Sequence, residues 1–252
     1  MRAPPAPEVV RDDTADSTDS TGSTGPTGPT GRTGRQAVRA VPALLPGVAL
    51  TAVPNEAAGI MRSKSHAGFL WVFEDLLDDG ARAALGTAAE QAGLRYAFPG
   101  TGMAGDLLPV PEPVHPELTF VRVDDDDLLR AYADLKARAY GFPLEDGRDG
   151  LAGSSLWKSG VFAYLGLRDG TPVTCAATVE AEGRLFVVLV ATDPACERRG
   201  YGEAVTRKAL YEGARAAGLT RATLHATAAG APVYPRIGFR PNSPLRFYAL
   251  GD

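Results

Sequence analysis

The feature that most constrains this chain of 252 residues is an apolar run that leads into a glycine-containing loop. The run, Arg184–Thr192 (RLFVVLVAT), predicts a central strand that is buried on both faces of a sheet. Pro194 ends the strand, and the loop Glu197–Gly202 (ERRGYG) follows it. A helix is predicted over Glu203–Ala217, with Gly218 just after its end. A buried strand, a loop and a helix in this order favour an α/β fold.

The loop has the residue types of a phosphate site. Gly200 and Gly202 let the backbone approach a ligand closely, because they have no Cβ. The first N–H groups of a helix have no intrahelical acceptor, so they can bind a phosphate or a pyrophosphate. Arg198 and Arg199 add positive charge at the rim. No Gly-Lys-Ser/Thr follows, so the loop is not a P-loop, and Val205 stands where a Rossmann fingerprint has its third glycine.

Alternation of apolar residues, helical spacing and turn residues predict the other elements around this one. Residues 118–250 read in the order β-α-β-β-β-α-β-α-β, which is a mixed α/β layer fold, that is, an α+β type of mixed sheet. The further strands are Leu118–Val123, Gly160–Leu167, Thr171–Glu180, Thr220–Ala226 and Phe239–Leu250, and the further helices are Leu128–Tyr140 and Ala231–Ile237.

Two segments precede this part of the chain. Residues 1–36 are dominated by Thr, Ser, Gly, Pro and Asp, which predicts a disordered tail. Within it a glycine falls at every third position over Gly22–Gly34, but four triplets are too few for a collagen helix.

Residues 40–113 form a second, smaller segment with no polar constellation. We expect a strand over Gly68–Glu74, a helix over Asp78–Ala92 and a short strand over Leu94–Phe98. A proline-rich stretch that includes Pro109 and Pro116 then predicts a stiff, extended connector between the two parts of the chain.

Composition excludes several classes of protein. The chain is 44% hydrophobic and 22% charged, as ordinary globular domains are. No apolar run reaches the roughly 18 residues that span a bilayer, and the first residues lack the apolar region of a secretory signal. We therefore expect a cytoplasmic protein with no membrane partner. The predominance of arginine among the basic residues, with abundant Ala and Gly, suggests a bacterial source.

Metal and nucleic-acid chemistry are also disfavoured. Cys175 and Cys196 are the two cysteines, and three histidines are scattered singly, so no metal site is expected. The formal net charge is −4 and no basic stripe is present, which argues against a nucleic-acid partner.

A second group of residues, Ala231–Phe239 (APVYPRIGF), lies one strand after the loop helix. Its Tyr234 carries a phenol that can donate a proton. Together with residues 188–205 (VLVATDPACERRGYGEAV), this block resembles the GNAT superfamily of acetyl-CoA-dependent N-acetyltransferases. The family's loop motif is Gln/Arg-x-x-Gly-x-Gly/Ala, and its later block is Tyr-x-x-x-Gly-Phe. The resemblance covers about 118–250, and residues 40–113 look like a degenerate GNAT-like half.

The resemblance implies a GNAT acyl-CoA N-acyltransferase fold and direct transfer of an acetyl group from acetyl-CoA to a primary amine. Acetyl-CoA is expected where the central strand separates from its neighbour, with a strand backbone N–H on the thioester oxygen and Tyr234 protonating the departing thiolate. Thr227 stands where many members have an Asn. The implied cofactor-binding residues are Val190, Ala191, Thr192, Arg198, Arg199, Gly200, Tyr201, Gly202, Glu203 and Thr227.

Three positions depart from the family pattern. Glu197 stands where the family has Gln or Arg, Thr227 replaces Asn, and Pro235 follows the tyrosine, where proline disfavours a helical conformation of Tyr234. These departures keep a second hypothesis open, a catalytically decayed acyl-CoA-binding sensor or scaffold. A third hypothesis is an acyltransferase for longer chains or for an oxygen nucleophile.

The base that would deprotonate the amine, which is mostly an ammonium ion at neutral pH, stays open. Candidates are Glu180, Asp193 and His225, and Cys196 is a candidate for a covalent acetyl-cysteine. Trp157 and Lys158 precede the hairpin, where an acceptor site is usual in the family. The acceptor, whether a small molecule, an antibiotic, a peptide N-terminus or a lysine, and the oligomeric state stay open too.

Overall fold

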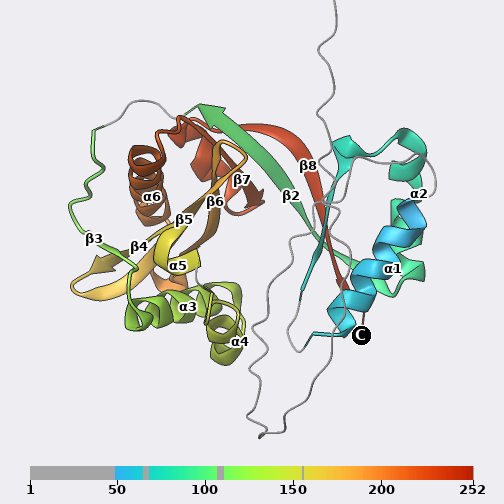
Figure 1. Ribbon diagram of the computed structural model, residues 1–252, viewed down its shortest axis with the longest axis horizontal. Coiled ribbons are helices and arrows are strands. Elements are labelled where there is room, and N and C mark those ends of the chain that lie inside the picture. The colour runs from blue at the N-terminus through green and yellow to red at the C-terminus, as the bar shows by residue number, and fades with distance from the viewer. Residues whose placement is uncertain (1–48, 65–67, 107–110, 155, 252) are drawn as a thin grey trace, which may run out of the picture. The chain divides into compact units, whose positions relative to one another are not determined.

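The computed structural model describes residues 49–64, 68–106, 111–154 and 156–251 (Figure 1). The predicted tail of residues 1–36, with its glycine triplets, lies outside the described residues. So do residues 40–48 of the second predicted segment and Pro109 of the predicted connector.

The described residues contain six α-helices, three 3-10 helices and eight strands. The α-helices are α1 (Ala49–Arg62), α2 (Asp79–Gln91), α3 (Asp126–Tyr140), α4 (Leu144–Asp149), α5 (Leu156–Ser159) and α6 (Tyr201–Ala217), and the 3-10 helices are η1 (Glu74–Leu76), η2 (Pro194–Cys196) and η3 (Ala231–Ile237). The strands are β1 (Leu70–Phe73), β2 (Leu94–Asp106), β3 (Thr119–Arg122), β4 (Val161–Arg168), β5 (Thr171–Ala181), β6 (Arg184–Thr192), β7 (Arg221–Thr227) and β8 (Arg240–Leu250).

The predicted α/β fold and the predicted order of elements over 118–250 are confirmed. Local residues explain the boundaries of α3: the side chain of Asp125 accepts a hydrogen bond from the Leu128 N–H at 2.7 Å, and Gly141 ends the helix at φ +71°. The short helices α4 and α5 and the helix α1 were not predicted. The predicted helix over 231–237 is a 3-10 helix that continues through Tyr234 and Pro235, so the expectation that Pro235 keeps Tyr234 out of a helical conformation is wrong. Packing of the Tyr234 side chain in the core outweighs that local preference.

All eight strands lie in one sheet, in the order β1-β8-β2-β7-β6-β5-β4-β3. Among the pairs of described strands, β6 and β7 are parallel and the others are antiparallel. The turn between β4 and β5 has Asp169 at φ +48° and Gly170 at φ +77°, the left-handed pair that a tight hairpin requires.

Strand β2 is longer than the predicted Leu94–Phe98. It continues to Asp106 and pairs with both β7 and β8 (Figure 1). The glycines of β2 allow close approach: a Cβ on Gly100 would clash with the Phe247 ring, and one on Gly105 with the Gly238 carbonyl.

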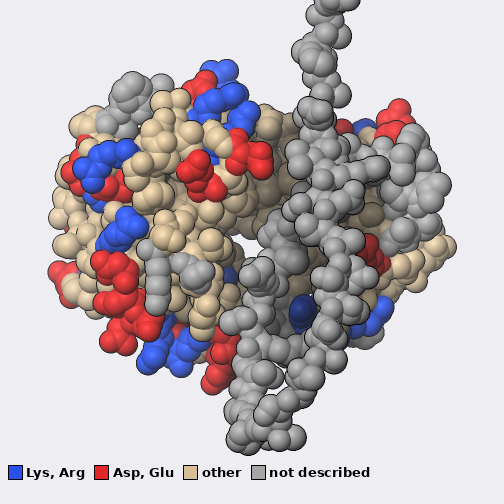
Figure 2. All heavy atoms as spheres, in the orientation of Figure 1, with Lys and Arg blue, Asp and Glu red and all other residues tan. Residues whose placement is uncertain are grey.

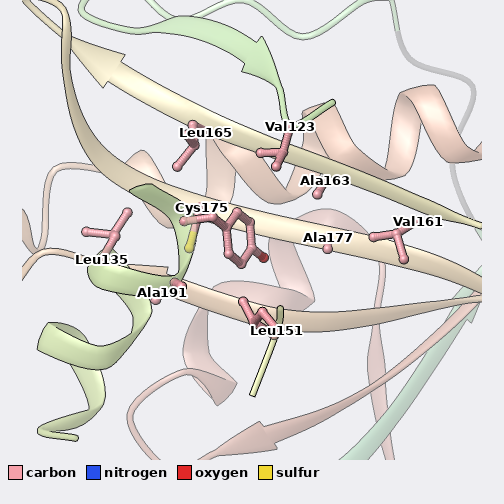
Figure 3. Packing of buried hydrophobic residues seen from close by; sticks show 11 residues of the cluster. Val123, Leu135, Leu151, Val161, Ala163, Leu165, Cys175, Ala177 and Ala191 are labelled. Atoms are coloured by element: carbon pink, nitrogen blue, oxygen red, sulfur yellow. The ribbon is translucent and has the colours of Figure 1, made fainter. Parts of the chain in front are cut away.

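Helices cover the two faces of the sheet differently. Helix α3 packs on one face of β4, β5 and β6, where Leu135 meets Leu165 and Cys175 (Figure 3). Helix α6 packs on the opposite face, where Val205 and Ala209 meet β4 and β5. On that same α6 face, α1 and α2 cover strands β1, β2 and β8. We call the two sides of the sheet the α3 face and the α6 face.

No helix in the described part of the chain is long and apolar enough to cross a membrane. On the surface shown in Figure 2, Lys and Arg side chains lie interspersed with Asp and Glu side chains where the chain is coloured. The visible charge is therefore mixed rather than gathered into one basic stripe.

Candidate functional site

Strands β6 and β7 run side by side for three residue pairs and then separate. Leu185, Phe186 and Val187 pair with residues 222–224 of β7, and β7 then continues beside β2 as far as Thr227. Just beyond this separation point β6 has a bulge, where the register to β5 shifts and Leu189 adopts φ +55°. An edge of β6 is thus left without a strand partner among the described residues, as the family resemblance implied.

Three hydroxyl groups hold the bulge. The Tyr132 hydroxyl donates to the Leu189 carbonyl at 2.8 Å, and the Tyr140 hydroxyl donates to the Val190 carbonyl at 2.7 Å. The Thr174 hydroxyl donates to the next carbonyl along the strand, at 3.0 Å. Because left-handed backbone at a leucine costs about 1–3 kcal/mol, these bonds offset a real strain.

Tyr132 and Tyr140 are eight residues apart on α3, about two helical turns, so both side chains reach the same strand. Sequence reasoning used them only as apolar members of a helix face. Their spacing on one helix face was the available signal, but the bulge that they contact leaves no pattern in the sequence. The pKa of Tyr140 is raised to about 12, first by burial of its hydroxyl and then by Cys175.

The backbone of β6 directs donors toward the open edge. The Asp193 N–H donates to the Val173 carbonyl at 2.9 Å, on the β5 side. N–H groups alternate along a strand, so those of Thr192 and Val190 point to the opposite side, from which β7 has departed. This arrangement fits the predicted pairing of residues 190–192 with an extended ligand, which stays a prediction.

The glycine loop is open. Arg198 and Gly200 adopt left-handed conformations, at φ +63° and φ +81°, and Gly200 precedes α6 without a side-chain cap. The Ala204 N–H makes the first backbone bond of the helix, to the Gly200 carbonyl at 3.0 Å. Within the described residues, the N–H groups of the three residues before it, at 201–203, donate no hydrogen bond. Unpaired N–H groups at a helix start carry partial positive charge and can bind an anion.

Packing favours glycine at position 202, because a Cβ there would lie 3.2 Å from the Thr192 hydroxyl at the end of β6. The side chain of Tyr201 is buried, and its hydroxyl donates to Glu117 at 2.9 Å. Tyr201 can therefore offer a ligand only its backbone N–H.

The charged side chains at the loop differ in their partners. Arg198 and Arg199 are exposed and form no ion pair with the described residues. Glu197 beside them is also exposed and also forms no ion pair with the described residues. Glu203 is instead held by Arg207 at 2.9 Å and by Arg236 at 2.7 Å. Burial works against ionisation of Glu203, but these two hydrogen-bonded arginines outweigh it and lower its pKa. The Glu203 carboxylate is therefore neutralised within the protein.

The Arg236 contact also ties η3 to the first turns of α6, and η3 carries Tyr234. Tyr234 is buried in a cluster with Leu224 and Ala226 of β7, against which Val190 packs. Burial, and then the nearby Tyr140, raises the pKa of Tyr234, so its phenol is protonated at neutral pH. The Tyr234 hydroxyl makes no hydrogen bond within the described residues. The structure thus brings Tyr234 to the open edge of β6.

The other candidate residues from the sequence lie in turns or away from the bulge. Thr227 is exposed at the end of β7, where its hydroxyl oxygen accepts from the Gly230 N–H at 3.3 Å, so it serves a turn. Glu180 pairs with Leu185 at the start of β6, away from the bulge. Asp193 accepts from the Ala195 N–H at 2.9 Å, which is also a turn contact.

Of the three base candidates, His225 is the one that follows directly after the last β6–β7 pair. Trp157 packs against Tyr132, with ring centroids 5.5 Å apart, and the Lys158 side chain lies outside the described residues. Cys175 is buried, which raises the pKa of its thiol to about 12 and makes it a packing residue. No group of His, Cys, Asp or Glu that could hold a metal ion occurs in the described part of the chain.

Comparison with known proteins gives one family and a set of similar structures. Residues 128–239 match the model of the Acetyltransferase (GNAT) family. No curated protein matches the chain.

Among solved structures, the chain is similar to a GCN5-related N-acetyltransferase from Kribbella flavida, with a TM-score of 0.56 and 20% identity over 79% of this chain and 77% of that one. It is also similar to a protein from Novosphingobium aromaticivorans assigned to the GNAT family, with a TM-score of 0.52 and 21% identity over 79% of this chain and 80% of that one. At such identities the likeness concerns the fold.

Proposed function

Residues 128–239 of this chain belong to the GNAT superfamily of acetyltransferases, and we propose that the chain transfers an acetyl group from acetyl-CoA to a primary amine. The observation that carries the proposal is the open start of α6, where the N–H groups at 201–203 donate no hydrogen bond within the described residues. They and Gly200 would hold the diphosphate of the cofactor, with Arg198 and Arg199 adding charge.

The open edge of β6 has groups that suit the rest of the cofactor. The backbone of residues 190–192 would pair with the pantetheine arm as an added strand does. The N–H of Val190, next to the bulge, would donate to the thioester oxygen as negative charge develops on it. In other enzymes one such donor contributes about 3 kcal/mol to the lowering of the barrier.

Bound acetyl-CoA supplies an acetyl group on a thioester, and the acceptor supplies a neutral amine nitrogen. The nitrogen lone pair forms a bond to the acetyl carbon, the carbon–sulfur bond breaks, and sulfur keeps its electron pair. The nitrogen loses one proton to a base or to water, and the thiolate takes up one proton from water.

Tyr234 would donate a hydrogen bond to the departing sulfur. A thiol has an ordinary pKa of about 8.5, well below that of this tyrosine, so full proton transfer from Tyr234 is uphill. Tyr234 is thus better suited to stabilise the thiolate by a hydrogen bond than to transfer its proton to the sulfur.

The glycines at the two ends of α6 provide a matched experiment. Gly200 and Gly218 are both left-handed, at φ +81° and φ +68°, and a Cβ on either would meet nothing within 4 Å. Gly200→Ala and Gly218→Ala should therefore lose similar stability, about 1–2 kcal/mol. In calorimetry only Gly200→Ala should weaken acetyl-CoA binding, by tenfold or more, whereas acetyl-pantetheine, which lacks the diphosphate, should bind both variants alike. Equal acetyl-CoA affinity in the two variants would remove the loop from the site.

A second candidate function is a sensor that binds acyl-CoA without turning it over. It is favoured by Glu197, an exposed carboxylate beside the arginines of the loop, and by the turn contacts that occupy Asp193. Tight acetyl-CoA binding with no thiol release across a panel of amines would support it. A cytoplasmic location, the division into residues 40–113 and 118–250, and the degenerate GNAT-like origin of the first segment stay predictions of the sequence.

A further inference from the structure

A group of aromatic side chains lies on the α3 face, next to the separation point of β6 and β7. In the described part of the chain, α3 covers β5 and β6 on this face, and the helices beside β1, β2 and β8 lie on the other face. We call this group the aromatic wall. It consists of Trp71 and Phe73 from β1, Phe98 from β2, Phe186 from β6, His225 from β7 and Phe247 from β8.

The wall is continuous although its residues come from five strands. The His225 ring lies 4.9 Å from Phe186 and 5.1 Å from both Trp71 and Phe73, measured between ring centroids. Phe247 continues the wall, at 5.0 Å from Trp71 and 4.6 Å from the Phe98 ring. Gly102 of β2 pairs with His225, and with no side chain there the rings of β1 can reach across β2.

Part of the wall is open to solvent. Trp71 is 46% exposed, which is a large exposure for an indole that touches other aromatic rings, whereas Phe247 is buried and the other four wall residues are partly buried. The Nδ1 atom of His225 is the buried side-chain polar atom that has no hydrogen-bond partner among the described residues. Burial lowers the pKa of His225, so the histidine is neutral at pH 7 and adds no charge to the wall.

The place of the wall relates it to the proposed reaction. Phe186 lies in the last paired stretch of β6, and His225 is the first residue of β7 after that stretch. The glycine loop leads into α6, which lies on the opposite face of the sheet. Tyr234 of η3 packs on that same face, in a cluster with Leu210 of α6. An amine must therefore reach the thioester from the α3 face, past Phe186 and His225.

We propose that the aromatic wall binds the body of the acceptor, and that the acceptor is a primary amine carried on a short chain from an aromatic ring. This inference rests on the proposed acetyl transfer. Offset or edge-to-face contacts with Trp71 and Phe73 recognise a flat ring. The short chain would carry the nitrogen past Phe186 to the acetyl carbon.

Steady-state kinetics with two amines test the proposal. With acetyl-CoA fixed and free thiol measured, kcat/KM for 2-phenylethylamine should exceed that for n-butylamine by tenfold or more. Trp71→Ala should reduce the ratio of the two kcat/KM values about tenfold. The change should come mostly from a higher KM for 2-phenylethylamine, because the ring of the acceptor loses its contact with the indole. Phe73→Leu, a milder change, should remove part of the preference.

Tyr96→Ala is the matched control. Like Trp71, Tyr96 is an exposed aromatic residue, at 50% exposure. It lies on β2 and contacts Tyr248 on the α6 face, away from the wall. This variant should keep the preference of the wild-type chain. Equal kcat/KM for both amines, or a preference that survives Trp71→Ala, would overturn the aromatic acceptor and leave acetyl transfer intact.

Fluorescence gives a readout that does not depend on turnover. The chain has two tryptophans, so Trp157→Phe leaves Trp71 as the sole emitter. Titration with 2-phenylethylamine should shift Trp71 emission to shorter wavelength, and n-butylamine should not. A shift without thiol release would support the wall and refute the transferase.

Two other occupants of the wall would each overturn the proposal. If a second copy of the chain covers the wall, Trp71→Ala should dissociate an oligomer in size-exclusion chromatography without changing the preference between the amines. If another segment of the chain covers it, Trp71 emission in the Trp157→Phe variant should lie at short wavelength and stay unchanged on titration.

Discussion

The glycine loop and the aromatic wall lie on opposite faces of the same separation point and are built in opposite ways. The loop offers backbone N–H groups from consecutive residues, 198–203, and its side chains either are exposed or point into the protein. The wall offers side chains from five strands that are far apart in the sequence. A site made of backbone tolerates changes of side chain, except where glycine is required. A site made of side chains can change its ligand with one substitution.

This difference explains how the departures from the family pattern can be accommodated. Glu197 is exposed and projects from a loop whose proposed grip comes from N–H groups and from two exposed arginines. Glu203, a second carboxylate at the loop, is neutralised by Arg207 and Arg236. Neither carboxylate removes the N–H donors at the start of α6.

The largest effect is expected where the loop needs glycine. Gly200→Val places a branched side chain at φ +81°, a conformation that costs valine about 1–3 kcal/mol and would be relieved by moving the loop. We expect acetyl-CoA affinity to fall about a hundredfold or more, measured by calorimetry, while 2-phenylethylamine still shifts Trp71 emission. Gly218→Val at the other end of α6 is the control for strain alone. A normal affinity in Gly200→Val would show that the loop does not hold the cofactor.

Tyr234→Phe should have the next largest effect and should separate binding from chemistry. The phenol is expected to donate to the departing thiolate, and hydrogen bonds to charged groups contribute about 1.5–3 kcal/mol. We therefore expect kcat to fall about tenfold to a hundredfold, with acetyl-CoA affinity unchanged. Because the pKa of Tyr234 is raised, its ionisation should not lower kcat of the wild-type chain between pH 7 and about 10. An unchanged kcat in Tyr234→Phe would exclude this tyrosine from the mechanism.

The contrast between a loop of consecutive residues and a wall of distant ones also explains what the sequence could predict. Residues that are adjacent in the chain carry the loop, so the glycine spacing and the strand before it were enough to predict its place, and Arg184–Thr192 is the predicted central strand. Tyr234 was found because its block has a recognisable spacing to Gly238 and Phe239. The fold over 118–250 followed from alternation and turn residues.

The wall and the bulge could not be predicted in this way. Trp71 and His225 are three strands apart in the sheet, and their contact depends on Gly102 of β2, in a stretch where the sequence suggested no strand. The bulge at Leu189 depends on hydroxyl groups from another helix. Such features arise from tertiary packing, which leaves no periodic pattern in one sequence.

A smaller effect is expected in the alkaline stability of the fold. Burial, and then Cys175, raises the pKa of Tyr132 well above the value of about 10 in an unfolded chain. The stabilisation that comes with this shift is complete below pH 10 and is lost as pH rises above it, because only the unfolded chain then ionises readily. The free energy of unfolding should fall above pH 10, by about 1.4 kcal/mol per pH unit for each such phenol. In urea denaturation Tyr132→Phe should be less stable at pH 7 by about 1–2 kcal/mol but should decline less steeply; an identical slope would contradict the burial of this hydroxyl.

The smallest effect is expected at Tyr140, the last residue of α3, whose hydroxyl donates to the Val190 carbonyl at the open edge of β6. The residue as a whole is 45% exposed, so it buries less side-chain surface than Tyr132 does. Tyr140→Phe should change stability by less than about 1 kcal/mol. If the bond helps to hold the Val190 N–H toward the thioester, kcat should fall a few-fold, with acetyl-CoA affinity and the preference for 2-phenylethylamine both unchanged. A changed preference with unchanged kcat would instead assign Tyr140 to the acceptor side, as an extension of the aromatic wall along α3.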